Sequence, residues 1–320
     1  MKRFEVEANV YSLSFWGTNG FSFKGVRFVP FENHKEIEES IKEEEEHHPT
    51  GTVSVEVTAD NCEKAVEEAL SLLTDYSTLL TFVEGHDVFF RDFTCFEVEN
   101  GVKVKKSTVV HSMRFGKAVG SRIVNLWSVA QFMEAALPLI QDKSYVEKTG
   151  IKLAIFWFNE AQNYNLVEIE FPALWISLEI LANSYAKSNP KAFLLSEGEW
   201  SQLMTKFGEV LENLKIDSKD VQQRLYGALG FAKQGSMEDK INYLLQGYAF
   251  TQYSPEVEYF NEMRNTVLHG RPLASINFDP FETTRKLERL LVKLILSVLN
   301  FYDEKLVHPV FLKDDLLAMT

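Results

Sequence analysis

The stretch EMRNTVLHGRP (Glu262–Pro272) decides how the C-terminal half of this sequence is interpreted. Before it, apolar residues recur at intervals of three and four, as on one face of an amphipathic helix. Gly270 is the residue type that ends many helices, because glycine adopts the left-handed backbone conformation at little cost. We therefore expect a helix to end at His269, with Arg264 and Asn265 in its last turns.

A helical wheel separates the polar side chains of this segment. With about 100° per residue and Phe260 at zero, Arg264 falls at about 40°, inside an apolar arc from about −60° to about +80°. Asn265 and His269 fall at about 140° and about 180°, on the other face. A charge in an apolar arc needs a carboxylate, a phosphate or water at an interface. Asn265 precedes His269 by four residues, so its amide is expected to reach the imidazole.

Other histidines of the sequence carry less weight. Arg27 is followed by His34 after six residues, but this spacing crosses a proline in an extended segment, with no amphipathic helix before it. In and beside the acidic segment Lys35–Pro49, His34, His47 and His48 lie near carboxylates, yet no fixed metal-ligand spacing is present. We expect a solvated acidic loop or short helix there, and no metal site.

Composition excludes several classes of protein. The 320 residues are 45% hydrophobic and 13% aromatic, which is enough to bury a large core. Ten of the thirteen net negative charges fall in residues 1–110, which argues against broad nucleic-acid binding but leaves room for a local basic site in the second half. Cys62 and Cys95 stand far apart, which favours a reduced setting without disulfides or zinc. The longest apolar run, Leu290–Tyr302, is too short to span a bilayer, and the N-terminus is unlike a signal peptide. We expect a cytoplasmic protein.

The hydrophobic pattern changes once along the chain. Residues 1–110 contain β-branched and aromatic runs and one helix capped by Asp60 or Asn61, and Asn100-Gly101 is typical of a hairpin turn. From about Ser112 the pattern is helical, and the expected helices include Ser121–Gln141 and Ser144–Asn163. Further helix starts are indicated by capping residues: Ser196 with Glu199, Ser236 with Asp239, and Asp279 before Pro280. We expect an α+β domain over residues 1–112 and an all-α bundle over residues 113–320, packed closely together.

The residues RNTVLHG resemble the Arg-(polar)-x3–5-His motif of the HEPN superfamily, small helical domains of prokaryotic toxins and RNA-cleaving immune proteins. The preceding helices resemble those of the HEPN branch linked to abortive infection. The residues that carry this second likeness are Phe158, Glu160, Ala161, Phe171, Leu174, Trp175, Leu178, Glu179 and Leu181. The resemblance covers roughly residues 120–310 and implies an all-α HEPN-like bundle.

HEPN ribonucleases cleave RNA without a metal, so the resemblance implies roles for these residues and no cofactor. His269 would be the general base or acid for attack of a 2′-hydroxyl on the adjacent phosphate, and Arg264 would bind that phosphate. Asn265 would orient the histidine, Glu179 would hold the arginine, and Gly270 would end the helix. The implied protein is an endoribonuclease that acts as a toxin or antiphage defence effector. Its N-terminal domain would serve regulation or recognition.

The partners implied by the resemblance are RNA, a second copy of the chain, and an antitoxin or another defence-system protein, but no membrane. On one helix, Arg264 and His269 lie about 140° apart and roughly 7.5 Å apart along the axis. One phosphate would reach both groups more easily in a two-fold dimer that shares the site between chains. The alternative function is a noncatalytic HEPN module that binds a nucleotide or a protein. In a purely structural interpretation, His269 interacts with the helix dipole and Arg264 only pairs with Glu179. Four tryptophans at helical spacing are expected in the core: Trp127, Trp157, Trp175 and Trp200.

Overall fold

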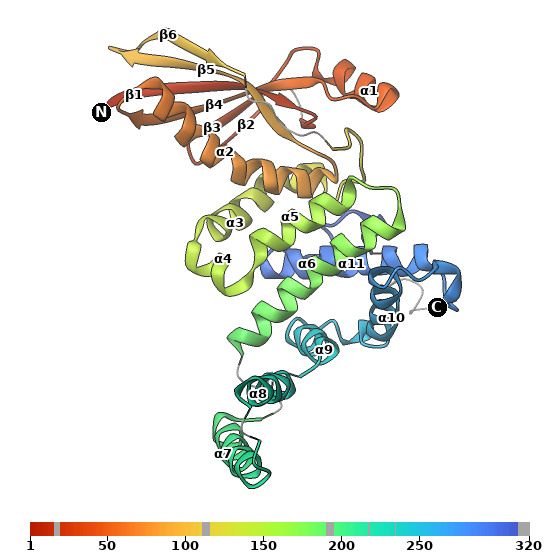
Figure 1. The fold of residues 1–320 in the computed structure, drawn as a ribbon. Coiled ribbons are helices and arrows are strands. Elements are labelled where there is room, and N and C mark those ends of the chain that lie inside the picture. The colour runs from red at the N-terminus through yellow and green to blue at the C-terminus, as the bar shows by residue number, and fades with distance from the viewer. Residues whose placement is uncertain (16–19, 111–115, 190–194, 217, 234, 313–320) are drawn as a thin grey trace.

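The computed structural model describes residues 1–15, 20–110, 116–189, 195–216, 218–233 and 235–312. An antiparallel sheet with two helices forms the N-terminal part, and a series of helices forms the C-terminal part (Figure 1). This order confirms the expected change from α+β to all-α structure along the chain. The predicted boundary at residue 112 lies outside the described residues.

The sheet has six strands in the order β2-β3-β4-β1-β5-β6, and all neighbouring pairs are antiparallel. The strands are β1 (Lys2–Tyr11), β2 (Phe21–Phe23), β3 (Val26–Pro30), β4 (Pro49–Ala59), β5 (Phe89–Glu99) and β6 (Val102–Val109). Successive side chains of a strand point to opposite faces, so Phe4, Val6 and Val10 of β1 are buried on one face. The predicted hairpin turn is confirmed, because Asn100 and Gly101 both have positive φ between β5 and β6.

Helix α2 (Cys62–Glu84) packs beneath the sheet, and α1 (His34–Glu44) lies at one end of it (Figure 1). The Asn61 side chain accepts a hydrogen bond from the Lys64 N–H at 2.9 Å, which confirms one of the two capping residues expected from the sequence. The helix ends at Gly85, whose φ is 68°. Its apolar residues face both the sheet and the bundle.

The two cysteines are joined in a disulfide, so the expectation that they remain unpaired is wrong. Cys62 is the first residue of α2, and Cys95 lies on β5 with its side chain buried towards that helix. Packing of α2 on the sheet brings their Cα atoms to 6.1 Å, although 33 residues separate them in the sequence. This pairing depends on the tertiary contact, which the spacing of the cysteines did not indicate. The cytoplasmic location remains a prediction.

The C-terminal part contains α3 (Val129–Gln141), α4 (Lys143–Thr149), α5 (Ile151–Gln162), α6 (Val167–Ser188), α7 (Glu197–Asn213), α8 (Lys219–Lys233), α9 (Met237–Gly247), α10 (Glu256–Leu268) and α11 (Pro280–Val298). Both helices whose ranges are predicted above differ from the structure. The helix expected from Ser121 begins only at Val129, because Val124 instead forms a β-bridge with Val307. The helix expected over Ser144–Asn163 is broken at Gly150, where φ is 67°.

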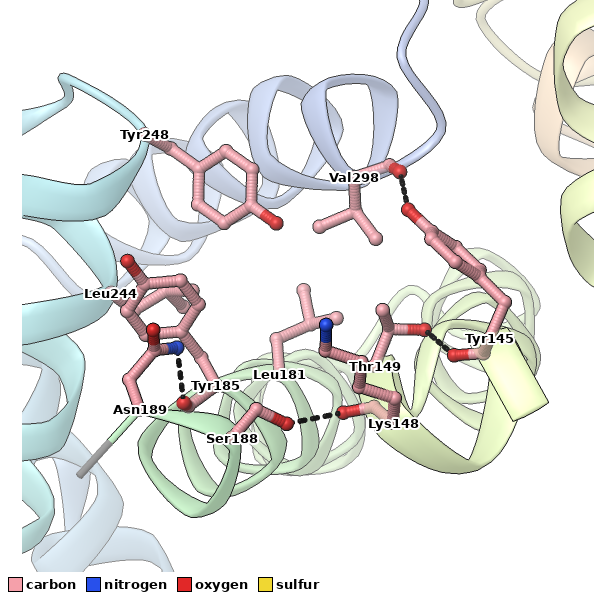
Figure 2. Close-up of a pocket in the computed structure, with 10 residues that line it drawn as sticks. All are labelled: Tyr145, Lys148, Thr149, Leu181, Tyr185, Ser188, Asn189, Leu244, Tyr248 and Val298. Carbon is pink, nitrogen blue, oxygen red and sulfur yellow. Dashed lines mark hydrogen bonds between the residues drawn. The ribbon is translucent and has the colours of Figure 1, made fainter.

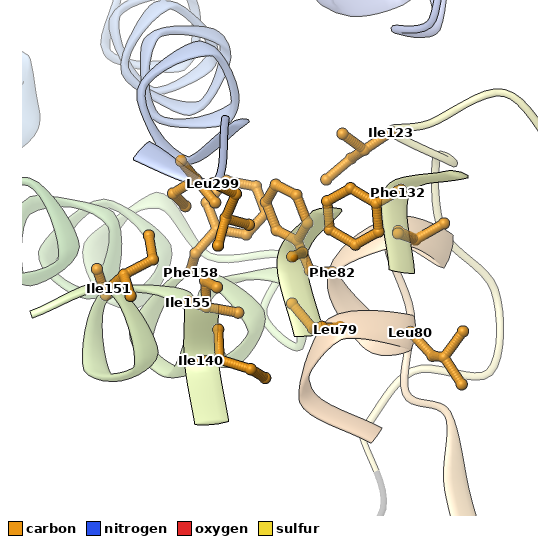
Figure 3. Packing of buried hydrophobic residues seen from close by; sticks show 14 of the residues in the cluster. Leu79, Leu80, Phe82, Ile123, Phe132, Ile140, Ile151, Ile155, Phe158 and Leu299 are labelled. Carbon is orange, nitrogen blue, oxygen red and sulfur yellow. The ribbon is translucent and has the colours of Figure 1, made fainter. Parts of the chain in front are cut away.

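One continuous core joins the sheet to the bundle. Phe82 of α2 packs against Phe132 of α3 and Phe158 of α5, with ring centroids 6.1 and 5.3 Å apart (Figure 3). Leu79 of α2 and Leu299, which follows α11, belong to the same cluster. The close packing of the two halves that the sequence predicted is therefore observed.

Helices α7 and α8 extend from the bundle on the side away from the sheet (Figure 1). The rings of Phe207 and Tyr226 join these two helices, with centroids 5.4 Å apart. Of the tryptophans expected in the core, Trp175 is buried, Trp157 and Trp200 are partly buried, and Trp127 is 62% exposed. The prediction is wrong for Trp127, which precedes α3 in a short 3₁₀ turn instead of lying inside a helix. Across the described residues, no helix has the length and apolar character of a membrane span.

Candidate functional site

The motif helix α10 ends as the sequence predicted. His269 is its C-terminal cap, and Gly270 follows in the left-handed conformation with φ 63°. The N–H of Gly270 donates to the carbonyl of Val267 at 3.1 Å, and the N–H of Arg271 donates to that of Thr266 at 2.9 Å. These two bonds form a Schellman motif, which satisfies carbonyls that the end of the helix would leave unpaired. His269 is thereby held at the very end of the helix.

Arg264 lies at the edge of the apolar face of α10, with 38% of its side chain exposed. The same face buries Val257, Phe260 and Met263. The Arg264 Nη2 atom lies 3.8 Å from Glu179 Oε1 on α6, which is beyond hydrogen-bond length. Its Nε is buried and has no hydrogen-bond partner among the described residues. Glu179 therefore neutralises the guanidinium without occupying its donors, and the group retains the capacity to bind an anion.

Asn265 and His269 are both exposed, on the other side of α10 from its buried face. The Asn265 Oδ1 atom accepts a hydrogen bond from Arg264 Nη1 at 3.0 Å. In this structure the asparagine therefore orients the arginine, where the sequence had suggested that it would reach the imidazole. Arg271, which sequence reasoning did not single out, is exposed two residues beyond His269 and adds a second cation at this end of the helix.

The motif lies on an open surface. His269 is exposed and Arg264 is partly exposed, and the cavities of about 280, 400 and 570 Å³ are lined by other residues. A reaction at this surface would need a long substrate or a second protein surface to shield it from water. That two chains share the site stays a prediction.

A cavity of about 280 Å³ lies between α4, α6, α9 and the end of α11 (Figure 2). The Tyr145 hydroxyl is committed to the carbonyl of Val298, whereas Tyr248 points its hydroxyl into the space. Burial raises the pKa of Tyr248 to about 12, so its hydroxyl stays protonated at neutral pH. Leu181 lines this cavity and lies about 200° around α6 from Glu179, so the cavity and the motif occupy different sides of that helix.

The acidic segment Lys35–Pro49 is partly a short helix, as expected, but His34, which precedes it, is buried, and His47 within it is partly buried. His34 is 1% exposed, and its Nδ1 lies 2.9 Å from the carbonyl of Phe31. His47 bridges Ser12 Oγ and the carbonyl of Gly116, at 2.8 and 3.0 Å. The carboxylates of Glu43, Glu44, Glu45 and Glu46 are exposed, whereas Glu38 is partly buried.

Within the described residues, Glu44, Glu46 and His48 bring three potential metal-ligand atoms within 4.8 Å of one another. The two carboxylates are exposed and His48 is partly exposed, and its Nε2 is hydrogen-bonded to Glu44 Oε2 at 2.9 Å. Acidic groups on a surface often approach one another in this way without an ion, so we assign no site to them.

Sequence reasoning missed a polar cluster where the sheet meets the bundle. Glu38, Glu84, His86 and Arg122 line a cavity of about 400 Å³, although they come from α1, the end of α2, the turn that follows it and the segment before α3. One signal was available: Glu84 directly precedes the glycine that ends α2, where the helix dipole disfavours a negative charge. Nothing in the sequence indicated its partners.

Comparisons with known proteins add no family to these observations. A scan against protein-family models, a search of curated proteins and a search of solved structures each returned no match. The function must therefore be argued from the residues themselves.

Proposed function

We propose that this chain is a metal-independent endoribonuclease of the HEPN type, acting as a toxin or an antiphage defence effector. The observation that carries the proposal is the exposed end of α10. A half-exposed arginine with spare donors lies five residues before an exposed histidine, which a Schellman motif holds at the helix terminus. The similarity of RNTVLHG to the HEPN motif supplies the chemistry.

In the proposed reaction, His269 removes the proton from a ribose 2′-hydroxyl. The oxygen then attacks the adjacent phosphorus, and the bond from phosphorus to the 5′-oxygen of the next nucleotide breaks. A protonated acid, supplied by the second His269 of a dimer or by water, gives a proton to that leaving oxygen. Arg264 stabilises the charge that develops on the phosphate oxygens, Asn265 fixes the guanidinium, and Arg271 contacts the flanking phosphate.

Two chains share the site in this proposal. α10 is regular from Glu256 to Leu268, so Arg264 and His269 point to different sides of one helix. The open surface around them and the exposed Leu268, at 56%, leave room for a second copy. In this arrangement the arginine of one chain faces the histidine of the other across the RNA.

The direct test is cleavage of a mixed RNA pool by purified protein in excess EDTA. We expect products with 2′,3′-cyclic phosphate ends, and a loss of about 10²–10⁴-fold in rate for His269→Ala. His48→Ala, which removes a partly exposed histidine from the other half of the chain, is the matched control and should cleave normally. Loss of cleavage on chelation, or 5′-phosphate products, would contradict the mechanism.

The second candidate is a noncatalytic module that binds a nucleotide or a partner protein. The hydrogen bond from Arg264 to Asn265 favours it to some extent, because it directs the asparagine away from His269. RNA binding that is weakened by Arg264→Ala, without cleavage by the wild-type protein, would support the module. Under either function we propose that the N-terminal domain, with its excess of carboxylates, serves regulation or target choice.

A further inference from the structure

The cavity between the two halves of the chain contains charged groups that the proposed ribonuclease does not use. Its volume is about 400 Å³, and α1, the end of α2, the loop after β1 and the segment 118–126 form its walls. Glycines let the chain cross closely here. The Cβ atom of an alanine at Gly85 would lie 2.2 Å from the carbonyl oxygen of Ser121, and one at Gly120 would lie 1.7 Å from that of Gly85. The walls are therefore fixed by backbone contacts.

Among the groups of this cavity, the Glu84 carboxylate costs the most free energy to bury. It is 1% exposed and lies at the C-terminal end of α2, where the helix dipole disfavours a carboxylate. Arg122 donates through Nε and Nη2 to the same oxygen, Oε2, at 3.1 and 2.7 Å. The other oxygen, Oε1, is buried and accepts no hydrogen bond from any described residue. A buried carboxylate oxygen without a donor is costly, which suggests that a donor is supplied from outside the chain.

His86 presents a second acceptor without a partner. Its Nε2 lies 2.8 Å from the carbonyl of Ser12, and a carbonyl can only accept, so Nε2 carries the proton. In the neutral form of such a ring, the lone pair is on Nδ1. That atom is buried and has no hydrogen-bond partner in the described part of the chain. Glu84 and His86, which both line the cavity, therefore each have an atom without a partner that can accept from an N–H or O–H donor, His86 in its neutral form.

The charges around the cavity indicate the sign of the missing group. The charges of Glu84 and Arg122 cancel, and Glu38 adds a further carboxylate, whose Oε1 accepts from the Phe15 N–H at 3.1 Å. Burial raises the pKa of Glu38, which shows how poorly water solvates its charge. Lys42 is exposed at the rim. Among the lining side chains that are not exposed, carboxylates therefore exceed cations by one, Glu38 and Glu84 against Arg122, and the unpaired atoms lack donors. Glu38, Glu84 and His86 do not form one of the three-ligand groups found among the described residues, which disfavours a metal ion.

We infer that this cavity binds a small organic cation with several N–H donors, such as a protonated primary amine or a guanidinium compound. The cation would donate to Glu84 Oε1 and to His86 Nδ1, and it would neutralise Glu38. A domain junction is a common place for such a ligand. Its binding would tie α1 and α2 to the segment that leads into the bundle. The inference does not depend on the ribonuclease activity.

The test uses the full chain and two probes, methylguanidinium chloride and n-propylammonium chloride. Binding is followed by saturation-transfer NMR on the probe and by the imidazole resonances of His86. We expect saturable binding of at least one probe at one site, with a shift of the His86 signals. Glu38→Gln should weaken binding at least tenfold, because it removes the uncompensated charge and keeps an oxygen for the Phe15 N–H. Glu44→Gln, an exposed carboxylate on the same helix α1, should leave binding unchanged.

Further variants protect this test from a folding artefact. Glu84→Gln should also abolish binding. If it does not fold, His86→Leu removes the other acceptor and should weaken binding of the same probe. Propionate and acetamide serve as anionic and neutral probes. Three results would overturn the inference. The first is no binding of either cation up to about its solubility limit, and the second is binding that Glu38→Gln and His86→Leu leave unchanged. The third is binding of acetamide in place of the cations, as expected for a site that holds only water.

Discussion

Two arginines of this protein pair with glutamates and have opposite consequences. The Nη2 atom of Arg122 lies 2.7 Å from Oε2 of Glu84, whose side chain is 1% exposed. Arg264 stands 3.8 Å from Glu179, with 38% and 27% of the two side chains exposed. The buried pair is fixed, because separating it would leave a charge without water. The half-exposed pair is loose, because water screens both charges. In the proposed function its guanidinium takes a phosphate in exchange.

The same contrast separates two helix ends. Gly85 and Gly270 both have positive φ, 68° and 63°. An added Cβ at Gly85 would meet the carbonyl of Ser121 at 2.2 Å, whereas one at Gly270 would meet nothing within 4 Å. The first turn is enclosed by another part of the chain, and the second is open. Structure at the junction is thus determined by tertiary contacts, and structure at the motif is local.

The largest effect is expected for catalysis at the open site. Arg264→Ala and His269→Ala should each lower RNA cleavage by about 10²–10⁴-fold. Mixing the two inactive proteins under conditions of subunit exchange should restore part of the activity, because one site of each mixed dimer keeps both groups. The measurement is cleavage rate against mixing ratio, with dimer formation followed in parallel. Mixed dimers as inactive as their parents would exclude a shared site.

The next largest effect is on stability and compares the two arginines directly. Arg122→Ala should lower the free energy of unfolding by about 3–5 kcal/mol, because it leaves the Glu84 charge buried and unpaired. Arg264→Ala should cost no more than about 1 kcal/mol, as expected for a partly exposed pair. Urea unfolding of both variants gives the two values. Replacing Glu84 and Arg122 together by methionine should recover most of the loss. Equal costs for the two arginines would mean that the Arg122–Glu84 pair is no more buried in its energetics than the Arg264–Glu179 pair.

The two glycines should differ in the same direction: replacing the enclosed glycine should lower the free energy of unfolding more than replacing the open one. Gly270→Ala should cost about 1–2 kcal/mol, from the left-handed backbone alone. Gly85→Ala should cost roughly 2–5 kcal/mol, because crowding against the Ser121 backbone adds about 1–3 kcal/mol to the same strain. Thermal or urea unfolding measures both. A larger loss for Gly270→Ala would mean that its surroundings are closed, for example by a dimer partner.

The last expected effect is the pH dependence of stability, which has opposite signs in the two halves. In the bundle, burial and the nearby Glu288 raise the pKa of Glu170 from 4.5 to about 7. The folded state then binds the proton more tightly, so stability falls as pH rises from 4.5 to about 7. In the sheet, hydrogen bonds from Lys2 and Lys106 lower the pKa of Glu97 from 4.5 to about 2. Here stability is lost as pH falls from 4.5 to about 2.

Glutamine variants separate these two contributions. Glu170→Gln should flatten the decline in the free energy of unfolding above pH 4.5, and Glu97→Gln should flatten the decline below it. Urea unfolding from pH 3 to pH 8 measures both limbs, with Glu44→Gln as the exposed control. If Glu170→Gln changed the free energy of unfolding only below pH 4.5, the pKa of Glu170 would not be raised in the folded protein.

The sequence alone determined the features that depend on neighbours along the chain. The order of sheet and helices followed from hydrophobic period. The helix starts at Ser196, Ser236 and Asp279 have the predicted capping bonds, and α10 ends at the predicted glycine. These features involve residues within about one helical turn of each other, so their energetics can be read from spacing. The exposed Arg264–His269 pair belongs to the same class, which is why a motif could indicate it.

Only the tertiary structure decided what distant segments do when they meet. Cys62 reaches Cys95 because α2 packs on the sheet, and Glu84 is neutralised by Arg122 because the segment before α3 crosses the end of that helix. Trp127 is exposed because a β-bridge to Val307 replaces the first turns of the expected helix. Each outcome depends on the balance between burying a group and finding it a partner, and that balance is set by chain segments far apart in the sequence.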